Sequence, residues 1–328
     1  GTLGPGATNL ITGVADANMD RAPLIALTGQ AELTRQHKES HQVMDVNAMY
    51  RPVTKWAHHI GHADTIPEVV RKAVRLARAE KPGAVHLELP EDVARSASAM
   101  PPLEPRRYRR PGADDKISDK AWELIRRSRH PIIIAGNGAI RKRASKQLRR
   151  FCEATGIGVV STFMAKGCVD LNANYCLFSI GLQQRDHVMA AIDEADLVIT
   201  LGYNLVEYPP RLWNPAGDKT VIHLDFEKAE IDAQYHPTVE MVGDLAHSLW
   251  MLNERVGRGE RLDFDLAGQR QVRARMLEEF SEYAEDDAVG AIKPQKALWE
   301  ARRALGPVSY THLRAHETSD DISYAVFC

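Results

Sequence analysis

Short, uninterrupted apolar runs bounded by proline, glycine or acidic residues constrain the fold of this chain more than any other feature. A run of this kind, without polar alternation, is typical of a strand buried on both faces, as strands of parallel sheets are. Segments with apolar residues at helical spacing separate the runs, which predicts an α/β fold with parallel sheets. The predicted strands are residues 23–29, 84–90, 131–136, 158–162, 196–202, 220–225 and 239–243.

A stretch rich in proline and arginine, residues 96–116, reads as a linker between two α/β units at 1–95 and 117–256. Residues 257–306 are highly charged at first and are predicted to be largely helical. Residues 307–328 fit neither the helical nor the strand period, and part of this segment resembles translated adapter sequence. We interpret it as a non-native tail, with a native disordered tail as the alternative.

Composition argues against several classes of protein. The 42 Lys and Arg nearly balance the 44 Asp and Glu, so no strong field favours a nucleic acid or membrane partner. No apolar run approaches the ~20 residues of a membrane helix. The four cysteines form no Cys-x-x-Cys pair, which argues against a zinc site and favours a reducing cytoplasm. The chain opens on Gly1 rather than Met, so an upstream targeting segment stays an open question.

Several sequence blocks carry a resemblance to a known family. Four occur in order near the start: Gly4-Pro5-Gly6-Ala7-Thr8-Asn9, Thr28-Gly29-Gln30, His41-Gln42-Val43-Met44-Asp45 and Pro52-Val53-Thr54-Lys55-Trp56. This set resembles the pyrimidine-binding domain of thiamine-diphosphate-dependent acetolactate synthases. Later blocks resemble the catabolic, acetoin-pathway branch of that family: Gly181-Leu182-Gln183, Gly202-Tyr203-Asn204-Leu205-Val206-Glu207-Tyr208-Pro209-Pro210 and Trp213-Asn214-Pro215. The resemblance covers about residues 1–306.

The resemblance implies a domain plan. Residues 1–95 correspond to the C-terminal part of a truncated pyrimidine-binding domain, and residues 117–256 to a complete doubly wound parallel-sheet central domain. Residues 257–306 correspond to a linker and the start of a diphosphate-binding domain.

The resemblance also implies an activity, in branched-chain amino acid or acetoin metabolism. The implied parent enzyme is a transferase of two-carbon units that condenses two pyruvates to 2-acetolactate with loss of CO2. Its cofactors are thiamine diphosphate and Mg2+, and its partner is a second subunit in a homodimer or homotetramer.

Two groups that the family uses have no counterpart in this sequence. One is the glutamate on an early strand that activates the cofactor, and the other is the Gly-Asp-Gly segment with a downstream Asn that holds magnesium and diphosphate. Gly243-Asp244-Leu245 is not a match for the latter. We therefore expect the chain by itself to be inactive, and we assign it no metal ligands.

The resemblance assigns Thr2, Pro5, Asn9 and Gln42 to the cofactor site, with Gln42 as a supporting catalytic residue near the reacting adduct. The Asn9 amide can donate and accept hydrogen bonds to a flat heterocycle. The neutral Gln42 amide can hold a carboxylate or carbonyl oxygen without adding charge. From the residues alone, a helix first turn for Asn9 and ordinary loop polarity for Gln42 remain the plain alternatives.

A second candidate site is the loop formed by Gly136, Asn137 and Gly138. It follows a predicted strand and precedes a helix, a context that can cradle phosphate on backbone N–H groups. Arg141 stands where a full Gly-x-Gly-x-x-Gly would have its last glycine. Biosynthetic relatives bind FAD in this domain and the catabolic branch generally does not, so FAD stays open as a further cofactor.

Two other functions remain open at this point. The parent could be another thiamine-diphosphate carboligase or decarboxylase that acts on a different 2-oxo acid. It could also be a non-catalytic nucleotide-binding module, which the Gly136 loop would favour. Three histidines, His58, His59 and His62, lie in a strand-like segment without a carboxylate pattern and are not predicted to bind a metal.

Overall fold

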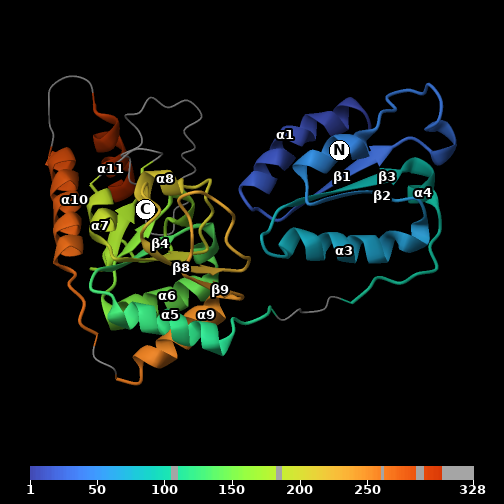
Figure 1. Ribbon diagram of the computed structural model, residues 1–328. Helices are drawn as coiled ribbons and strands as arrows, with labels where there is room; N and C mark the ends of the chain where they lie inside the picture. Colours follow the sequence, from blue (N-terminus) through green and yellow to red (C-terminus); the bar gives the residue numbers. More distant parts are fainter. Residues whose placement is uncertain (105–109, 182–186, 260–261, 286–291, 305–328) are drawn as a thin grey trace. The chain divides into compact units, whose positions relative to one another are not determined.

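The computed structural model describes residues 1–104, 110–181, 187–259, 262–285 and 292–304. The chain divides into two compact units, Gly1–Arg109 and Arg110–Cys328, and each contains one parallel sheet (Figure 1). The segment interpreted as a non-native tail, 307–328, lies outside the described residues. The α/β fold with parallel sheets that the apolar runs predict is confirmed.

The first unit contains a three-stranded parallel sheet with the order β1-β3-β2. Figure 1 shows helix α1 on one face of this sheet and α3 on the other. Pro5 and Pro67 lie in the first turns of these helices, where a missing N–H and a fixed φ are tolerated. The elements are α1 (Pro5–Met19), β1 (Leu24–Gln30), α2 (Val46–Tyr50), β2 (Trp56–His59), α3 (Ile66–Arg78), β3 (Ala84–Pro90) and α4 (Glu91–Arg95).

The second unit contains a six-stranded sheet with the order β6-β5-β4-β7-β8-β9, in which all strand pairs are parallel. Apolar residues of α5, α6 and α9 join one core cluster, and those of α7, α8 and α10 join another, so both faces are covered. The elements are α5 (Asp115–Arg127), β4 (Pro131–Ala135), α6 (Lys142–Thr155), β5 (Val159–Ser161), β6 (Cys176–Ser179), α7 (Met189–Glu194), β7 (Leu197–Leu201), α8 (Pro210–Trp213), β8 (Thr220–Asp225), β9 (Val239–Val242), α9 (Leu245–Val256), α10 (Ala267–Glu285) and α11 (Pro294–Ala304).

The strand order places a topological switch point in the middle of the second sheet. In chain order the strands run outward in one direction from β4 and in the other from β7, and these two strands are neighbours. In open α/β sheets, ligands bind outside the carboxyl ends of the strands at such a point. The loop that begins at Gly136 directly follows β4, so it lies at this position.

Two stretches differ from the sequence-based prediction. Strand β6 was not predicted, because its four residues carry too short a pattern to distinguish. In the charged stretch after α9, the described residues before Ala267 are not helical. There the Asp265 N–H donates to the carbonyl of Arg129 at 2.8 Å, and the Gln269 amide donates to the carbonyl of Pro131 at 2.7 Å. These bonds tie the segment to the start of β4, which local helical pattern could not reveal.

Within the ranges that the structure describes, no helix has both the length and the apolar character needed to cross a bilayer.

Candidate functional site

The N-terminal motif and the loop that carries Gln42 meet in the first unit. Gly4 caps α1 with φ 56° and ψ −123°, a conformation that favours glycine. A Cβ at Gly4 would lie 2.7 Å from Cβ of Gln42 and 2.8 Å from its carbonyl oxygen. Gln42 itself has φ 57°. Two blocks that are 38 positions apart in sequence therefore form one surface, which requires glycine at position 4.

A third block joins this surface through the start of the chain. The Gly29 N–H donates to the carbonyl of Gly1 at 3.0 Å, and a Cβ at Gly29 would lie 3.6 Å from the nitrogen of Leu3. The segment around Thr2 therefore runs beside the carboxyl end of β1, where the Thr28-Gly29-Gln30 block lies.

The four residues assigned to the cofactor site, Thr2, Pro5, Asn9 and Gln42, are all exposed. Asn9 follows Pro5 by four residues in α1, a spacing that places both on one face of the helix. Within the described part of the chain, the side chains of Thr2, Asn9 and Gln42 make no hydrogen bond to another residue. Their polar atoms are therefore available to a ligand.

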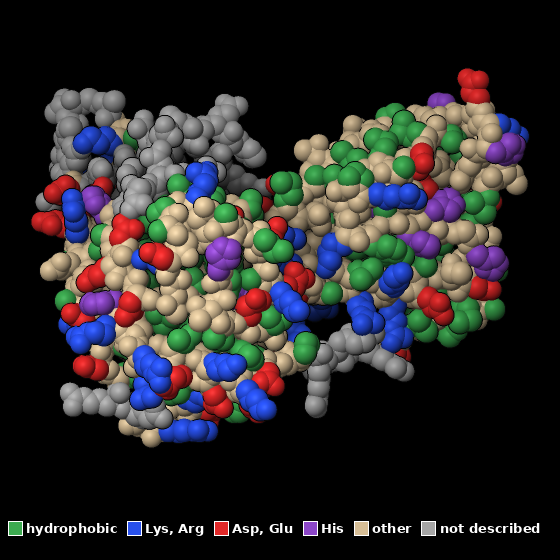
Figure 2. All heavy atoms as spheres, viewed as in Figure 1, with side chains coloured by type: hydrophobic (Ala, Val, Ile, Leu, Met, Phe, Trp, Pro, Cys, Tyr) green, Lys and Arg blue, Asp and Glu red, His purple; other side chains and the backbone are tan. Residues whose placement is uncertain are grey.

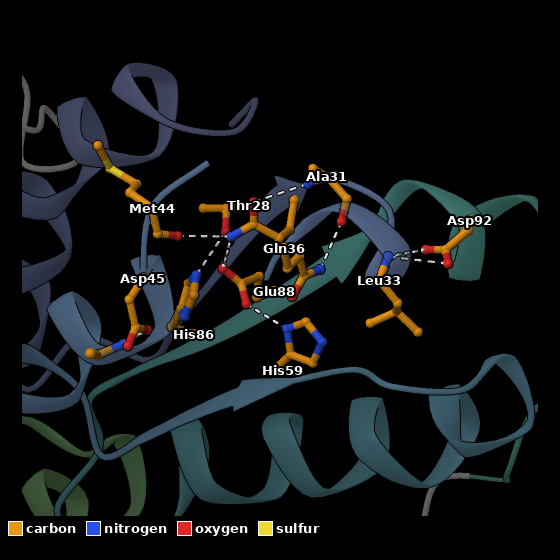
Figure 3. Close-up of polar contacts among 12 residues, drawn as sticks. Thr28, Ala31, Leu33, Gln36, Met44, Asp45, His59, His86, Glu88 and Asp92 are labelled. Atoms are coloured by element: carbon orange, nitrogen blue, oxygen red, sulfur yellow. Dashed lines mark hydrogen bonds and ion pairs between the residues drawn. The ribbon is translucent and has the colours of Figure 1, made fainter. Parts of the chain in front are cut away.

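A buried polar array lies beneath this surface, at the carboxyl ends of the three strands (Figure 3). Glu88 of β3 is only 3% exposed. One of its carboxylate oxygens accepts from the Gln30 amide at 2.9 Å, and the other lies 2.6 Å from Nδ1 of His59. A buried carboxylate is stable only when such partners compensate for lost hydration, so the array is held together as a unit.

The array reaches the loop that carries Gln42. The Gln30 amide nitrogen also donates to the carbonyl of Met44 at 2.9 Å. Asp45 then caps α2 by accepting from the Ala48 N–H at 2.9 Å. The Tyr50 hydroxyl at the end of α2 donates to the carbonyl of Ala7 in α1 at 2.7 Å. Residues 41–45 are thus anchored to β1 on one side and to α1 on the other.

His86 in β3 is a buried, neutral histidine in the same unit. Its Nε2 lies 2.9 Å from the Thr28 hydroxyl, and its ring stacks on Tyr50 with centroids 3.8 Å apart. Burial, with a smaller contribution from the positive N-terminus, lowers the pKa of His86 to about 4. Its Nδ1 is buried with no hydrogen-bond partner, so a proton added there would have no acceptor.

The loop of Gly136, Asn137 and Gly138 lies in the second unit, at the switch point between β4 and β7. All three residues are buried. The nearest acidic group is Glu207, whose carboxylate oxygens lie 3.1 and 3.2 Å from the Asn137 nitrogen. This loop is therefore an internal element of the fold, in contrast to the exposed residues of the first unit.

In the part of the chain that the structure describes, neither the histidine trio nor another set of residues gathers as metal ligands. Among the described residues, no three His, Cys, Asp or Glu side chains lie close enough together to hold an ion. His59 instead pairs with Glu88, and His62 accepts from the Asp64 N–H at its own helix start.

Sequence reasoning missed Glu88, His59, His86 and Glu207 as partners in these two arrangements. The strand run of residues 84–90 contained a detectable sign, because a histidine and a glutamate interrupt an otherwise apolar segment. For Glu207 and its partner Thr162 no local pattern was informative, since 45 positions separate them.

Comparison with known proteins places the chain in a family. Residues 118–252 match the profile described as "Thiamine pyrophosphate enzyme, central domain", and residues 1–49 match "Thiamine pyrophosphate enzyme, N-terminal TPP binding domain". Thiamine pyrophosphate is another name for thiamine diphosphate. The chain therefore belongs to the thiamine pyrophosphate enzyme family, as the sequence blocks predicted.

Individual relatives share this family. The acetolactate synthase of Bacillus subtilis (strain 168) is 35% identical over 258 residues, which cover 76% of this chain and 44% of the relative. The catabolic acetolactate synthase of Raoultella terrigena is 34% identical over 258 residues, 78% of this chain and 46% of the relative. The glyoxylate carboligase of Escherichia coli O157:H7 is 30% identical over 315 residues, 93% of this chain and 52% of the relative. The chain thus spans about half the length of these relatives.

Proposed function

We propose that this member of the thiamine pyrophosphate enzyme family supplies one wall of the cofactor site in an acetolactate synthase, which condenses two pyruvates to 2-acetolactate with release of CO2. The observation that supports this most directly is the contact between Gly4 and Gln42, which unites two family blocks on one exposed surface. The similarity to acetolactate synthases, one of them catabolic, supports the same reaction.

The roles of individual residues follow from what each can offer. When bound, thiamine diphosphate supplies the nucleophilic carbon and the electron sink for chemistry on 2-oxo acids. The Asn9 amide binds and orients the pyrimidine ring, and Thr2 and Pro5 shape the surface beside it. The Gln42 amide holds an oxygen of the 2-oxo acid. Its loop is kept in place by the Gln30–Met44 hydrogen bond.

The remaining cofactor groups and subunits belong to this proposal for the whole enzyme. Mg2+ and the diphosphate would be held by residues other than those described, which gather no three metal ligands. A second subunit of a homodimer or homotetramer would complete the site. Because the chain spans about half of its relatives, we expect it to form no acetolactate by itself.

Direct measurement of ligand binding tests the assigned wall. Thiamine diphosphate and a free aminopyrimidine are titrated into the purified chain while backbone amide signals are followed by NMR. We expect weak, saturable shifts at Asn9 and Gln42, which Asn9→Ala and Gln42→Ala each reduce several-fold because one hydrogen-bonding amide is lost. Asn174→Ala, which removes an exposed amide from the second unit, serves as the matched control.

The outcomes of this titration are distinct. Shifts centred away from Thr2, Asn9 and Gln42 would show that the surface is not the pyrimidine wall. Acetolactate formed from pyruvate, thiamine diphosphate and Mg2+ by the pure chain would overturn the expectation of inactivity.

A second reaction in the same family is supported by the glyoxylate carboligase relative, whose match extends over 93% of this chain. The alternative parent would then join other 2-oxo acids. Expressing the intact gene and comparing turnover of pyruvate with that of glyoxylate separates the two. A clear preference for glyoxylate would replace acetolactate synthesis as the assigned reaction.

A further inference from the structure

The switch point of the second sheet is where this fold would take a nucleotide, and the Gly136 loop is the element that would hold its phosphate. Phosphate binding by such a loop requires backbone N–H groups that point outward and are free to donate. Whether the loop can bind a phosphate therefore depends on which acceptors its backbone N–H groups already have.

The backbone N–H groups of this loop all donate to acceptors within the fold. The Gly136 N–H donates to the carbonyl of Leu201 at 2.9 Å, and the Gly138 N–H donates to the carbonyl of Gly202 at 2.8 Å. The Ala139 N–H turns back to the carbonyl of Gly136 at 2.9 Å. Only Asn137 donates to a negatively charged group, and that group is the protein's own Glu207.

The glycines of the loop serve the packing of two loops against each other. A Cβ at Gly138 would lie 2.6 Å from Cα of Gly202, and a Cβ at Gly202 would lie 2.4 Å from Cα of Gly138. A Cβ at Gly136 would lie 2.5 Å from Cα of Tyr203. Small residues are needed here because backbone meets backbone, so the glycine pattern does not by itself indicate a ligand.

Glu207 occupies the position of an anion at the loop. Its side chain is 3% exposed. In addition to the Asn137 N–H, it accepts from the Thr162 hydroxyl at 2.5 Å and from the Asn204 amide at 2.5 Å. All three groups donate toward the carboxylate, which is the pattern expected for an ionised acceptor. Burial nevertheless raises the pKa of Glu207 above its ordinary value, because removal from water disfavours the charged carboxylate.

Arg141, the basic residue nearest in sequence to this loop, also faces inward. Its guanidinium donates to the carbonyl oxygen of Asn137 at 2.9 Å and to the Asn137 side-chain oxygen at 3.1 Å. These bonds hold the loop through the oxygen atoms of Asn137.

We propose that Glu207 is a built-in anion that fills the nucleotide crevice of this domain and excludes the phosphates of FAD from the Gly136 loop. A bound phosphate would need the Asn137 N–H that Glu207 uses, and it would meet a buried like charge at contact distance. The residues at this loop therefore do not fit the phosphates of FAD, because Glu207 occupies their hydrogen-bond donor and repels their charge.

The experiment compares ligand binding by the wild-type chain with that by Glu207→Ala and Glu207→Asp. Equilibrium dialysis follows FAD, and the backbone amide signal of Asn137 in an NMR titration follows inorganic phosphate at neutral pH. We expect no saturable binding of either probe to the wild-type loop. Glu207→Ala should bind phosphate and FAD at least about tenfold more tightly, because a contact-range repulsion is removed and an N–H is freed. Glu207→Asp keeps the charge and should gain nothing.

Asp225→Ala is the matched control, because Asp225 is another buried carboxylate at a strand end and accepts from the Phe226 and Glu227 nitrogens. It should also gain no binding. A folded Glu207→Ala chain without improved binding would overturn the proposal.

The wild-type titration needs no variant, so it remains decisive if Glu207→Ala fails to fold. A saturable, phosphate-dependent shift of the Asn137 amide in the wild-type chain would show that Glu207 does not exclude the ligand. Because these readouts involve neither thiamine diphosphate nor catalysis, they stand independently of the proposed reaction.

Discussion

The two sheets of this chain are both parallel, yet they differ in how completely their faces are covered. Every residue of β4 and β7, at the centre of the second unit, is buried. In the first unit, Ile25 and Leu27 of β1 remain 41% and 49% exposed. These two residues alternate with buried ones, so they share one face of an edge strand. Figure 2 shows hydrophobic side chains at the surface of this unit.

The central strands of the second sheet are buried by the unit itself, whereas one face of β1 in the first sheet would be stabilised by packing against another surface. Parallel sheets are normally buried on both faces, and an edge strand with apolar side chains is a template for association. Buried titratable residues do not separate the interiors, because the first unit buries His86 and Glu88 and the second buries Glu207 and Asp225. We therefore expect the two units to differ most in what it costs to remove an apolar side chain from a strand, while the first unit also depends on pH through His86.

The largest expected effect comes from the same substitution made in the two sheets. Ile133→Ala in β4 removes a side chain that is 1% exposed and should lower the free energy of unfolding of the second unit by about 4 kcal/mol. Ile25→Ala in β1 should cost the first unit less than about 1 kcal/mol. Urea unfolding followed by hydrogen exchange, resolved by unit, measures both. Equal costs would mean that β1 is covered in solution.

The pH dependence of the first unit is expected to be the next largest effect. The folded pKa of His86, about 4, lies below the ordinary value of 6.5, so the unfolded state binds the extra proton more readily. The neutral His86 ring therefore contributes about 3 kcal/mol to the free energy of unfolding of the first unit above pH 6.5. This contribution is lost as the pH falls toward 4.

Thr28→Val combined with His86→Phe removes the titrating ring and its hydroxyl partner together, while an aromatic ring remains to stack on Tyr50. The unfolding free energy of this double variant should change by correspondingly less between pH 7 and pH 4. An unchanged pH profile would show that other groups dominate acid unfolding of the unit.

A smaller effect is expected from Glu88→Gln in the polar array. The new amide has one acceptor oxygen in place of two and no charge, so it serves Gln30 and His59 together only if His59 changes tautomer, and the first unit should lose about 2 kcal/mol. Hydrogen exchange at residues 41–45 should accelerate at the same time, because Gln30 also holds Met44. Glu68→Gln in the first turn of α3 is the exposed control. If residues 41–45 exchange at the wild-type rate, the array does not position the Gln42 loop.

The smallest effect on stability is expected from Ile25→Lys combined with Leu27→Lys. Because both side chains are about half exposed and a lysine stem can cover the same surface, the first unit should lose about 1 kcal/mol. Edge charges oppose strand-to-strand association, so sedimentation velocity should show less concentration-dependent association than in the wild-type chain. Identical sedimentation would place the contact surface elsewhere.

The sequence predicted most of the fold, because parallel strands leave continuous apolar runs that need no tertiary information. The run at residues 220–225 coincides with β8 (Thr220–Asp225), and the run at 84–90 coincides with β3 (Ala84–Pro90). Strand β6 was not predicted, because its four residues at the sheet edge are defined by pairing with β5 rather than by their own pattern.

The candidate site was predictable only in part. The blocks at Gly4 and Gln42 were recognisable as separate sequences, but their contact depends on a left-handed turn and the close approach of distant segments. The Gly136 loop shows the opposite case, because its sequence suited a phosphate while its N–H groups are used within the fold.

The sequence by itself determined the α/β class, the parallel sheets and the family, since these follow from local hydrophobic period and from ordered motifs. Only the tertiary structure decided that Glu88 binds His59 and Gln30, and that Glu207 fills the crevice beside Asn137. The physical reason is that a buried charge takes its partners from whichever strand ends lie next to it in space. Strand order sets those neighbours, and no local stretch of sequence encodes it.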